Sequence, residues 1–446
     1  MSGVRTVLLE DICNFEKGST GLMKAVPGEY PLVTTGTERR TCESYQFDTK
    51  AVCIPLVSST GHGHASLNNV HYQEGKFALG TILVALTAKN EAELDVHFLH
   101  LYLFQLKNVV LVPLMKGAAN VSLSITAIKG VEIPLPSIER QRAIVGKFKG
   151  VVLEEKNLIN ELTNQKNLLE KLREQILRDA IQGVLTKEWR LKHSNLVDSN
   201  KLLSDIKLEK EQLVTEKKIN KFKSFSNLCD EEKPYALPDG WTWCRLNDVI
   251  VELTDYHANG SYEKLKSAVE LLDKPNFAIM LRTTNFHQKS KTNYKYISST
   301  AYEFLSKSKV YPGDVIMNKI ANPGATFYVD DRGQPMSLAM NLFLLRFSRD
   351  LIVSKYAYYY LKASYEYIVS FSSGTATSTI TKDAVKKLRF PLPPLEEQKE
   401  IVSKVELALS TCDQLDVKLS NNTFYAKKLM QVVLKEEFAI SHKGED

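Results

Sequence analysis

A long internal repeat constrains the fold of this chain more than any other feature of its sequence. The segment IPLPSIERQRAIVGKF begins at Ile133, and the similar segment FPLPPLEEQKEIVSKV begins at Phe390, which is 390 − 133 = 257 residues later. The offset holds without a gap far into both segments, and upstream Gly117 matches Gly374 at the same distance. Two unrelated helices of similar composition would not keep one register over such a length, so the chain carries two copies of one structural unit.

Each copy of the repeat predicts a long helix. A Pro-Leu-Pro sequence cannot lie inside a helix, so it ends one element just before the helix begins. Apolar residues then recur at seven-residue spacing in two rows, which is typical of a coiled-coil seam. In the first copy the rows are Ile138, Val145, Val152 and Ile159, and Phe148, Leu162, Leu169 and Ile176; in the second they are Leu395, Val402 and Leu409, and Val405, Cys412, Leu419, Ala426 and Val433. We expect coiled-coil segments over 133–190 and 390–440, whose helices each run for about 40–50 residues, or about 60–75 Å, and pack against each other.

The rest of the chain divides into two globular segments, 1–132 and 236–389, and a charged linker, 191–235, which we expect to be partly helical. Both globular segments are rich in short β-prone runs separated by turn residues, which favours mixed α/β domains. The expected strands are Ala51–Val57, Gly80–Leu86, Phe277–Arg282, Val315–Asn318, Thr326–Val329 and Leu342–Phe347, with short helices at Lys355–Ser370. The apolar run Phe77–Ala88 is too short to span a bilayer and predicts one buried strand. The fold class is α+β, with two mixed α/β domains that alternate with two long helices in a pseudo-twofold repeat.

Length, charge and cysteine content narrow the function further. The 446 residues suffice for about three domains. Lys and Arg exceed Asp and Glu by 58 − 52 = 6, which excludes a uniformly basic surface and is compatible with local basic patches. The six cysteines form no C-x-x-C pair, which argues against a zinc site or a disulfide scaffold and favours a reducing compartment. Glu10 and Asp11 fall where a signal peptide would need its apolar stretch, so we expect a cytoplasmic protein.

Sequence motifs of nucleotide and metal chemistry are absent. The chain has neither a G-x-x-x-x-G-K-[ST] phosphate loop nor a G-x-G-x-x-G sequence after a strand. Asn322-Pro323-Gly324 lacks the second proline and the aromatic residue of the adenine methyltransferase motif, so it predicts a tight turn. His62-Gly63-His64 has no third metal ligand at a suitable spacing, which favours a loop of polar donors. We therefore expect no catalytic residue, no metal site and no cofactor in this chain.

Each globular segment contains one patch that suits nucleic acid. The stretch 276–302 holds no Asp or Glu, and its cations lie among amide and aromatic side chains, as phosphate and base-edge contacts require. Its candidates are Arg282, Asn285 and His287 for base edges and Lys289, Lys291 and Lys295 for phosphates, and Lys319 and Asn322 follow. In the first domain the candidates are Arg39, Arg40, Ser59, Thr60, His62 and His64, the last four on a loop whose glycines let the backbone approach a ligand. Either patch alone is equally compatible with a solvated loop, and the presence of two favours binding.

The chain resembles the specificity subunit of type I restriction–modification enzymes. The resemblance lies in IPLPSIERQRAIV and FPLPPLEEQKEIV, in the connector LLSDIKLEKEQLVTEKKINK, in EEKPYALPDGWTWCRLNDV and in VYPGDVIMNKIANPGATFYV. It implies two target-recognition domains, each reading one half of a split DNA site, and an antiparallel coiled coil that fixes the gap between the halves. The first domain departs from the family pattern, because its start, MSGVRTVLLEDICNFEKG, lacks the Pro-x-Gly-Trp entry of the second.

The same resemblance implies partners. Two modification subunits would dock along the helices, bind S-adenosylmethionine and methylate adenine, and restriction subunits that use ATP and Mg²⁺ for translocation would join them. The chain itself would be non-catalytic. Two other functions remain compatible with the residues alone. A two-armed assembly scaffold would not bind duplex DNA with steep salt dependence and sequence preference, and a self-contained nuclease would cleave DNA as the purified chain with a metal ion.

Overall fold

The structure is a computed structural model with two compact units. It describes residues 5–60, 63–118, 120–193, 197–221, 223–287, 293–374 and 377–440, without the side chains of residues 287 and 429–440. The first unit comprises 1–165 and 418–446, and the second comprises 166–417. Each unit contains one globular domain and a part of each long helix.

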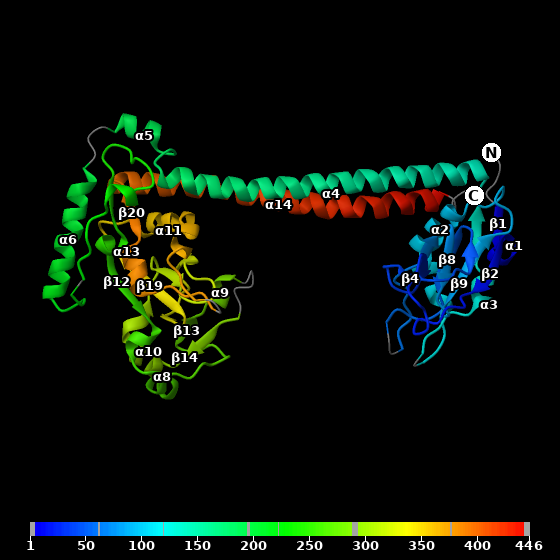
Figure 1. The fold of residues 1–446 in the computed structure, drawn as a ribbon, viewed down its shortest axis with the longest axis horizontal. Helices are drawn as coiled ribbons and strands as arrows, with labels where there is room; N and C mark the ends of the chain where they lie inside the picture. Colours follow the sequence, from blue (N-terminus) through cyan, green and yellow to red (C-terminus); the bar gives the residue numbers. More distant parts are fainter. Residues whose placement is uncertain are drawn as a thin grey trace. The chain divides into compact units, whose positions relative to one another are not determined.

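Domain 1 belongs to the first unit and consists of two four-stranded sheets and a two-stranded one (Figure 1). The strand orders are β2-β9-β6-β7 and β4-β3-β8-β5, and β1 pairs with β10. The elements are β1 (Arg5–Leu8), α1 (Leu9–Ile12), β2 (Cys13–Lys17), β3 (Tyr30–Val33), β4 (Arg40–Cys42), β5 (Phe47–Asp48), β6 (Ala51–Pro55), β7 (His71–Gln73), β8 (Lys76–Leu79), β9 (Leu83–Ala88), α2 (Val96–Val110), the 3-10 turn Val112–Leu114, α3 (Ile125–Lys129) and β10 (Glu132–Leu135). The apolar central strands β6 and β9 pack in one core with Phe98 and Leu99 of α2.

Domain 2 belongs to the second unit and repeats this plan. Its sheets are ordered β12-β19-β16-β17 and β14-β13-β18-β15, and β11 pairs with β20. The elements are β11 (Thr242–Arg245), α7 (Leu246–Val249), β12 (Ile250–Asp255), the 3-10 turn Tyr256–Asn259, α8 (Tyr262–Ala268), β13 (Ala278–Leu281), α9 (Thr284–His287), β14 (Lys295–Ile297), α10 (Ser299–Phe304), the 3-10 turn Ser306–Ser308, β15 (Lys309–Val310), β16 (Val315–Asn318), β17 (Thr326–Tyr328), β18 (Met336–Leu338), β19 (Leu342–Phe347), α11 (Ser354–Ala363), α12 (Tyr365–Val369), α13 (Lys382–Lys387) and β20 (Arg389–Leu392). Before it lie α5 (Lys187–Lys192), α6 (Ser199–Thr215) and the 3-10 turn Asp230–Glu232.

The two domains share details that go beyond strand order. Among the described residues each has one parallel strand pair, β3 with β8 and β13 with β18. At the carboxyl end of that pair the same backbone hydrogen bond recurs. Gly80 N–H donates to Val33 O at 3.0 Å, and Ala339 N–H donates to Leu281 O at 2.9 Å. The repeat seen in the sequence around the helices therefore extends through both globular domains.

The matched glycines Gly117 and Gly374 occupy equivalent tight turns. Their φ angles are +130° and +118°, a conformation that L side chains rarely adopt. A Cβ atom would lie 2.3 Å from Asn120 O at the first position and 2.4 Å from Thr377 O at the second. Only glycine fits either turn, which explains in physical terms why both copies carry it.

The long helices are α4 (Ile138–Ile181) and α14 (Leu395–Ile440). In the second unit they lie side by side and run antiparallel (Figure 1), because Arg173 of α4 pairs with Asp413 at 2.8 Å and Lys166 pairs with Asp416 at 3.8 Å. Several residues of the predicted heptad rows are buried, and these are Val145, Leu162, Leu169 and Ile176 of α4 and Val405, Cys412 and Ala426 of α14. The expected pairing of two long helices is confirmed, although Val152 of the other row is exposed.

Most expected elements are present, with two differences. The six strands named from the sequence appear as β6, β9, β13, β16, β17 and β19, and Lys355–Ser370 holds α11 and α12. The prediction of one strand over Phe77–Ala88 is wrong, because the chain turns at Gly80 and supplies β8 and β9 to different sheets. The helices begin after the Pro-Leu-Pro sequences, whose first residues belong to β10 and β20, and α4 ends before the separate helix α5. Within the described residues no helix is long and apolar enough to cross a membrane.

Candidate nucleic-acid interface

Arg282 and Asn285 come together directly after the parallel strand β13. The Arg282 N–H donates to Asn285 Oδ1 at 2.9 Å, and Arg282 Nη2 and Asn285 Nδ2 both donate to the carbonyl of Asn293, at 2.7 and 3.0 Å. The Nε of Arg282 is buried without a hydrogen-bond partner among the described residues. Two of the three side chains predicted to read bases, Arg282 and Asn285, are thus placed together and contact the same carbonyl.

A cavity of about 390 Å³ opens beside this loop. It begins where β13 and β18 end, and its lining combines apolar side chains with a few polar ones. The lining residues are Tyr256, Tyr262, Leu265, Lys266, Val269, Leu271, Met280, Arg282, Thr283, Thr284, Ala339, Met340 and Asn341. This volume is within the range of ligand-binding pockets.

The lysines predicted to contact phosphates are only partly described by the structure, and those that are described lie close to carboxylates. Lys289, Lys291 and the side chain of His287 lie outside the described residues. Lys295 forms an ion pair with Asp273. Lys319 lies 3.6 Å from Asp255, which also pairs with Lys382 at 3.0 Å. The basic character predicted from the local sequence is therefore reduced by carboxylates distant in sequence.

The tight turn predicted at Asn322-Pro323-Gly324 is present. The hydroxyl of Tyr365 donates to Asn322 Oδ1, and Gly324 has a φ of +85°. A Cβ at Gly324 would lie 2.7 Å from Cγ2 of Ile368. These contacts hold the loop between β16 and β17 against α12.

In domain 1, Arg39 and Arg40 differ in role. Arg39 donates to Gln73 Oε1 at 2.9 Å and to Tyr72 O at 3.2 Å, and it contacts Nδ1 of His71 at 3.3 Å. Its guanidinium thus fastens the loop after β3 to strand β7. Arg40 is exposed. Both arginines line a second cavity of about 410 Å³, with Leu22, Thr34, Thr35, Gly36, Thr37 and Glu38.

The hydroxyl-rich loop of domain 1 is closed by its own hydrogen bonds. Ser59 N–H donates to Ser66 O at 2.9 Å, Ser59 Oγ accepts from Asn68 N–H at 2.9 Å, and Thr60 Oγ1 lies 2.8 Å from Ser66 Oγ. His64 is exposed, and His62 lies outside the described residues. Among the described residues no three His, Cys, Asp or Glu side chains are grouped to hold a metal ion. Hydrogen bonds therefore join the two described sides of this loop, 58–60 and 64–68.

A buried glutamine anchors each long helix to its domain. Gln141 Oε1 accepts from Asp95 N–H at 2.8 Å at the start of α2, and Gln141 Nε2 donates to Pro136 O at 2.8 Å. Gln398 makes the same contacts in the second copy, because its Oε1 accepts from Val353 N–H at 2.9 Å and its Nε2 donates to Pro393 O at 3.0 Å. Both side chains are fully buried. The glutamine of the repeated motif thus fixes the direction in which the helix leaves the domain.

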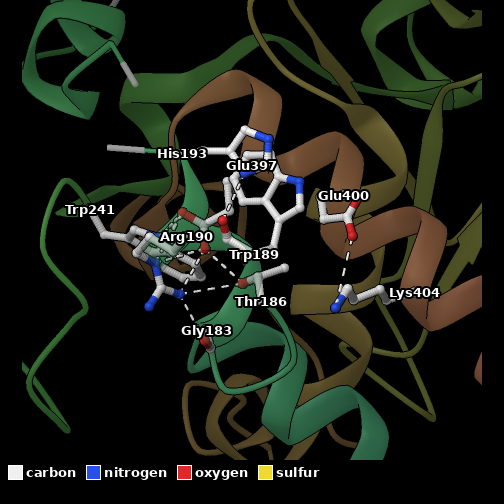
Figure 2. A network of polar contacts seen from close by, with 9 residues as sticks. All are labelled: Gly183, Thr186, Trp189, Arg190, His193, Trp241, Glu397, Glu400 and Lys404. Atoms are coloured by element: carbon white, nitrogen blue, oxygen red, sulfur yellow. Dashed lines mark hydrogen bonds and ion pairs between the residues drawn. The ribbon is translucent and has the colours of Figure 1, made fainter. Parts of the chain in front are cut away.

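The second copy has an additional buried network around Glu397 (Figure 2). The carboxylate of Glu397 is fully buried and accepts from Thr186 Oγ1 at 2.7 Å, Arg190 Nη2 at 2.7 Å and Trp241 Nε1 at 2.8 Å. Arg190 Nη2 also donates to Gly183 O at 2.7 Å. The network joins the end of α4, helix α5, the entry to domain 2 and the first turn of α14. The sequence analysis did not predict this network. A signal for it was present, because Glu397 replaces Arg140 of the first copy within an otherwise similar motif.

The connector before domain 2 packs on that domain. Helix α6 buries Leu202 and Ile206, and the buried Nζ of Lys210 donates to Asn247 O at 2.5 Å at the end of α7. Further along, Arg245 Nη1 and Nη2 donate to the two carboxylate oxygens of Glu232 at 2.7 and 2.8 Å. The connector is therefore a structural part of the second unit rather than a free linker.

These features define a class of protein: two copies of a mixed α/β domain, each anchored by a buried glutamine to a long helix of a coiled coil. Comparison with known proteins gives the family. The profile of the family described as "Type I restriction modification DNA specificity domain" matches residues 1–166 and 238–422. The chain belongs to this family.

Individual relatives share only about a quarter of their residues with this chain. The EcoAI specificity subunit of Escherichia coli is 27% identical over 253 residues, which are 55% of this chain and 40% of that protein. The EcoEI specificity subunit of Escherichia coli is 28% identical over 57% of this chain and 42% of its own length. The chain thus spans about two fifths of these two relatives. The EcoDI specificity subunit of Escherichia coli is 24% identical over 92% of this chain and 82% of that protein.

Solved structures support the fold. The crystal structure of the HsdS subunit from Thermoanaerobacter tengcongensis has a TM-score of 0.57, with 17% identity over 98% of this chain and 97% of that chain. A structure reported under "complex assembly and conformational transition of the type I R-M system" has a TM-score of 0.53, with 18% identity over 98% of both chains. At these identities the likeness concerns the fold alone.

Proposed function

We propose that this chain is the DNA sequence-specificity subunit of a type I restriction–modification complex, and that each globular domain reads one half of a bipartite DNA site. Family membership supports the class of function. The observation that carries the assignment to two half-sites is the duplicated domain. Sheet order and helix anchors are the same in both copies, whereas the loops after β3 and β13 have different sequences.

The proposal includes partners that bind the cofactors. Two methyltransferase subunits dock along α4 and α14, bind S-adenosylmethionine and methylate adenine, and restriction subunits use ATP and Mg²⁺. This chain contributes no catalytic group and works in the cytoplasm. Methyl transfer by the purified chain without any partner would contradict this part of the proposal.

Exchange of domain 2 tests the half-site assignment. We expect that replacing residues 199–389 with the matching segment of a family member changes one half of the methylated site and keeps the other. The exchanged segment includes the connector because Lys210 and Glu232 bind domain 2. Methylome sequencing of cells that carry the native or the exchanged chain measures both halves. A change in both halves, or in neither, would contradict the assignment, and an unaltered methylome after deletion of the native gene would favour the assembly scaffold.

The proposal also assigns the spacing between half-sites to the long helices. Four residues inserted after Lys156 add about 6 Å of helix and about 40° of rotation beyond one turn. If the seam re-registers, the preferred gap should grow by about two base pairs, since B-DNA rises about 3.4 Å per pair. If docking of the methyltransferase subunits fails instead, methylation is lost. A fully active insertion variant with an unchanged gap would show that the helices do not set the spacing.

A further inference from the structure

The cavity beside Arg282 lies at a position where sheets commonly bind ligands. It opens at the carboxyl ends of β13 and β18, the parallel pair of domain 2, and includes Met280 of β13 and the residues directly after each strand. The carboxyl ends of parallel strands are the usual ligand-binding edge, because the loops that leave them project from one side of the sheet. The predicted base readers Arg282 and Asn285 belong to one of these loops.

Three large apolar side chains remain in solvent around this cavity. They are Tyr262, Leu271 and Met340, which are 60%, 48% and 48% exposed; we call them the apolar rim. Single exposed apolar residues are common, but several around one cavity mark a surface that a binding partner covers. The folded domain leaves them uncovered, although Leu265 and Met280, which line the same cavity, are buried.

The charges of the cavity favour a polyanion as that partner. Its lining contains the cations Lys266 and Arg282 and no Asp or Glu. The buried Nε of Arg282 has no hydrogen-bond partner among the described residues. A surface with apolar and cationic groups but no acidic group matches the major groove of DNA, where phosphates are anionic and the 5-methyl of thymine is the apolar group at a base edge.

The corresponding loop of domain 1 has another character. It follows β3, and the cavity beside it is lined by Thr34, Thr35, Thr37, Glu38 and both arginines, with Leu22 as its large apolar residue. The two domains share one arrangement of strands, but the cavity at this sheet edge is largely apolar in domain 2 and largely polar in domain 1. This is the pattern expected if the edges read different base pairs.

We propose that the apolar rim of domain 2 determines specificity by contacting the 5-methyl group of a thymine in the half-site that this domain reads. The inference rests on the proposed function, because it names the base feature that one domain recognises. Tyr262, Leu271 and Met340 supply the apolar contact, and Arg282 lies beside them as the polar contact. The described lining of the domain 1 cavity contains one large apolar side chain, Leu22, and domain 1 reads its half-site through polar groups.

Uracil substitution tests the proposal without altering base pairing. Each thymine of the recognised site, on both strands, is replaced in turn by deoxyuridine, and binding of the complete methyltransferase complex is measured at constant salt. At one thymine of the domain 2 half-site we expect affinity to fall about fourfold, the effect of removing one buried methyl group. The same duplexes are then tested with the Leu271→Ser and Met340→Ser variants. Each variant should bind the thymine duplex more weakly and lose most of the discrimination against uracil.

Met23→Ser is the matched control, because Met23 is 99% exposed and lies in domain 1; it should keep the full uracil effect. Equal affinity for all uracil duplexes, or a domain 2 half-site without thymine, would overturn the proposal while leaving the proposed function intact. A uracil effect that persists in both rim variants would do the same. If the complex shows no preference for a bipartite site at all, the proposed function fails and this inference fails with it.

Discussion

Domains 1 and 2 differ in which lysine donates a hydrogen bond to the first short helix of the domain. Each begins with a strand followed by a one-turn helix, α1 or α7, whose end leaves carbonyl groups without helical partners. In domain 1, Lys89 from the end of β9 donates to Glu10 O at 2.6 Å. In domain 2 the equivalent carbonyl, Asn247 O, accepts from Lys210 of the connector helix α6 at 2.5 Å. The comparison shows that domain 1 supplies this cap from its own sheet, whereas domain 2 depends on the segment before it.

A second difference lies at the start of the long helices. Both copies keep the buried glutamine, but the residue before it is Arg140 in the first copy and Glu397 in the second. Glu397 is fully buried under α5 and the entry to domain 2, while Arg140 is exposed. The contacts common to both copies lie within the repeat, and the contacts that differ belong to the connector. This predicts that disturbing the connector destabilises the second unit and spares the first.

The largest effect should come from Arg190. Arg190→Ala leaves the Glu397 carboxylate buried without its cation, which typically costs about 3–5 kcal/mol. We expect the free energy of unfolding of the second unit to fall by about that amount. Hydrogen exchange followed by mass spectrometry measures it, because protection of β16 and β19 should drop while protection of β6 and β9 stays unchanged.

Two further variants identify the cause. Arg140→Ala is the matched change in the first copy and should cost less than about 1 kcal/mol, since that residue is exposed. Adding Glu397→Gln to Arg190→Ala should recover part of the lost protection, because the amide removes the buried charge and keeps an oxygen for Thr186 and Trp241. No recovery would show that the loss comes from packing of Arg190 rather than from the unpaired carboxylate.

Low pH should destabilise domain 1 and spare domain 2, which is the reverse of the effect expected for Arg190→Ala. Strand β7 places His71 in a buried position, whereas the equivalent position in β17 is Phe327. Burial, reinforced by the charge of Arg39, lowers the pKa of His71 to about 4. In the unfolded chain the pKa is about 6.5, so the unfolded state binds a proton first as pH falls. Stability from neutral His71 is therefore complete above about pH 6.5 and is lost towards pH 4, by up to about 3 kcal/mol.

Protection of β6 and β7 at pH 7 and pH 4.5 measures this loss after correction for the intrinsic exchange rates. His71→Gln cannot take up a proton, so its protection should vary less between the two pH values. His64→Gln is the control, because His64 is exposed and accepts a hydrogen bond from Ser58 Oγ through its backbone carbonyl. If native and His71→Gln chains lose protection equally, the acid sensitivity of domain 1 has another source.

The repeat made the coarse fold predictable, because heptad spacing and Pro-Leu-Pro depend on local chain geometry. Short strands such as β16 and β19 were also recognisable from short runs of apolar residues. The split of Phe77–Ala88 was not, since hydrophobicity alone does not show that Gly80 turns the chain into another sheet. Sheet order likewise depends on contacts between distant segments, which one sequence does not reveal.

The candidate site was predictable only in part, for the same reason. Arg282 and Asn285 are close in sequence, and the structure brings them together. The expectation of an acid-free patch did not include Asp273, which is 22 residues from its partner Lys295. Arg190 lies 207 residues from Glu397, so no local pattern could have paired them. Local sequence patterns were enough to identify the candidate loops. The carboxylates that pair with their cations are distant in sequence, so those patterns could not reveal them.

The smallest predicted effect tests the two lysine caps. Lys210→Met removes a charged donor from a buried carbonyl and should lower the free energy of unfolding of the second unit by about 1.5–3 kcal/mol. Lys89→Met removes the equivalent contact from an exposed lysine, and we expect a loss within about 0.5 kcal/mol in the first unit. Urea titration followed by hydrogen exchange in each unit measures both. Equal losses would mean that the connector cap is no more important than the cap within domain 1.

Alkaline pH sharpens this test, because burial lowers the pKa of Lys210 to about 8. The unfolded chain keeps a pKa near 10.4, so between about pH 8 and 10.4 it binds more protons than the folded chain does. The contribution of Lys210 to stability should therefore rise with pH across that window, as the buried charge is relieved. The difference in stability between the native chain and Lys210→Met should change in this window. A constant difference would show that Lys210 keeps its proton throughout.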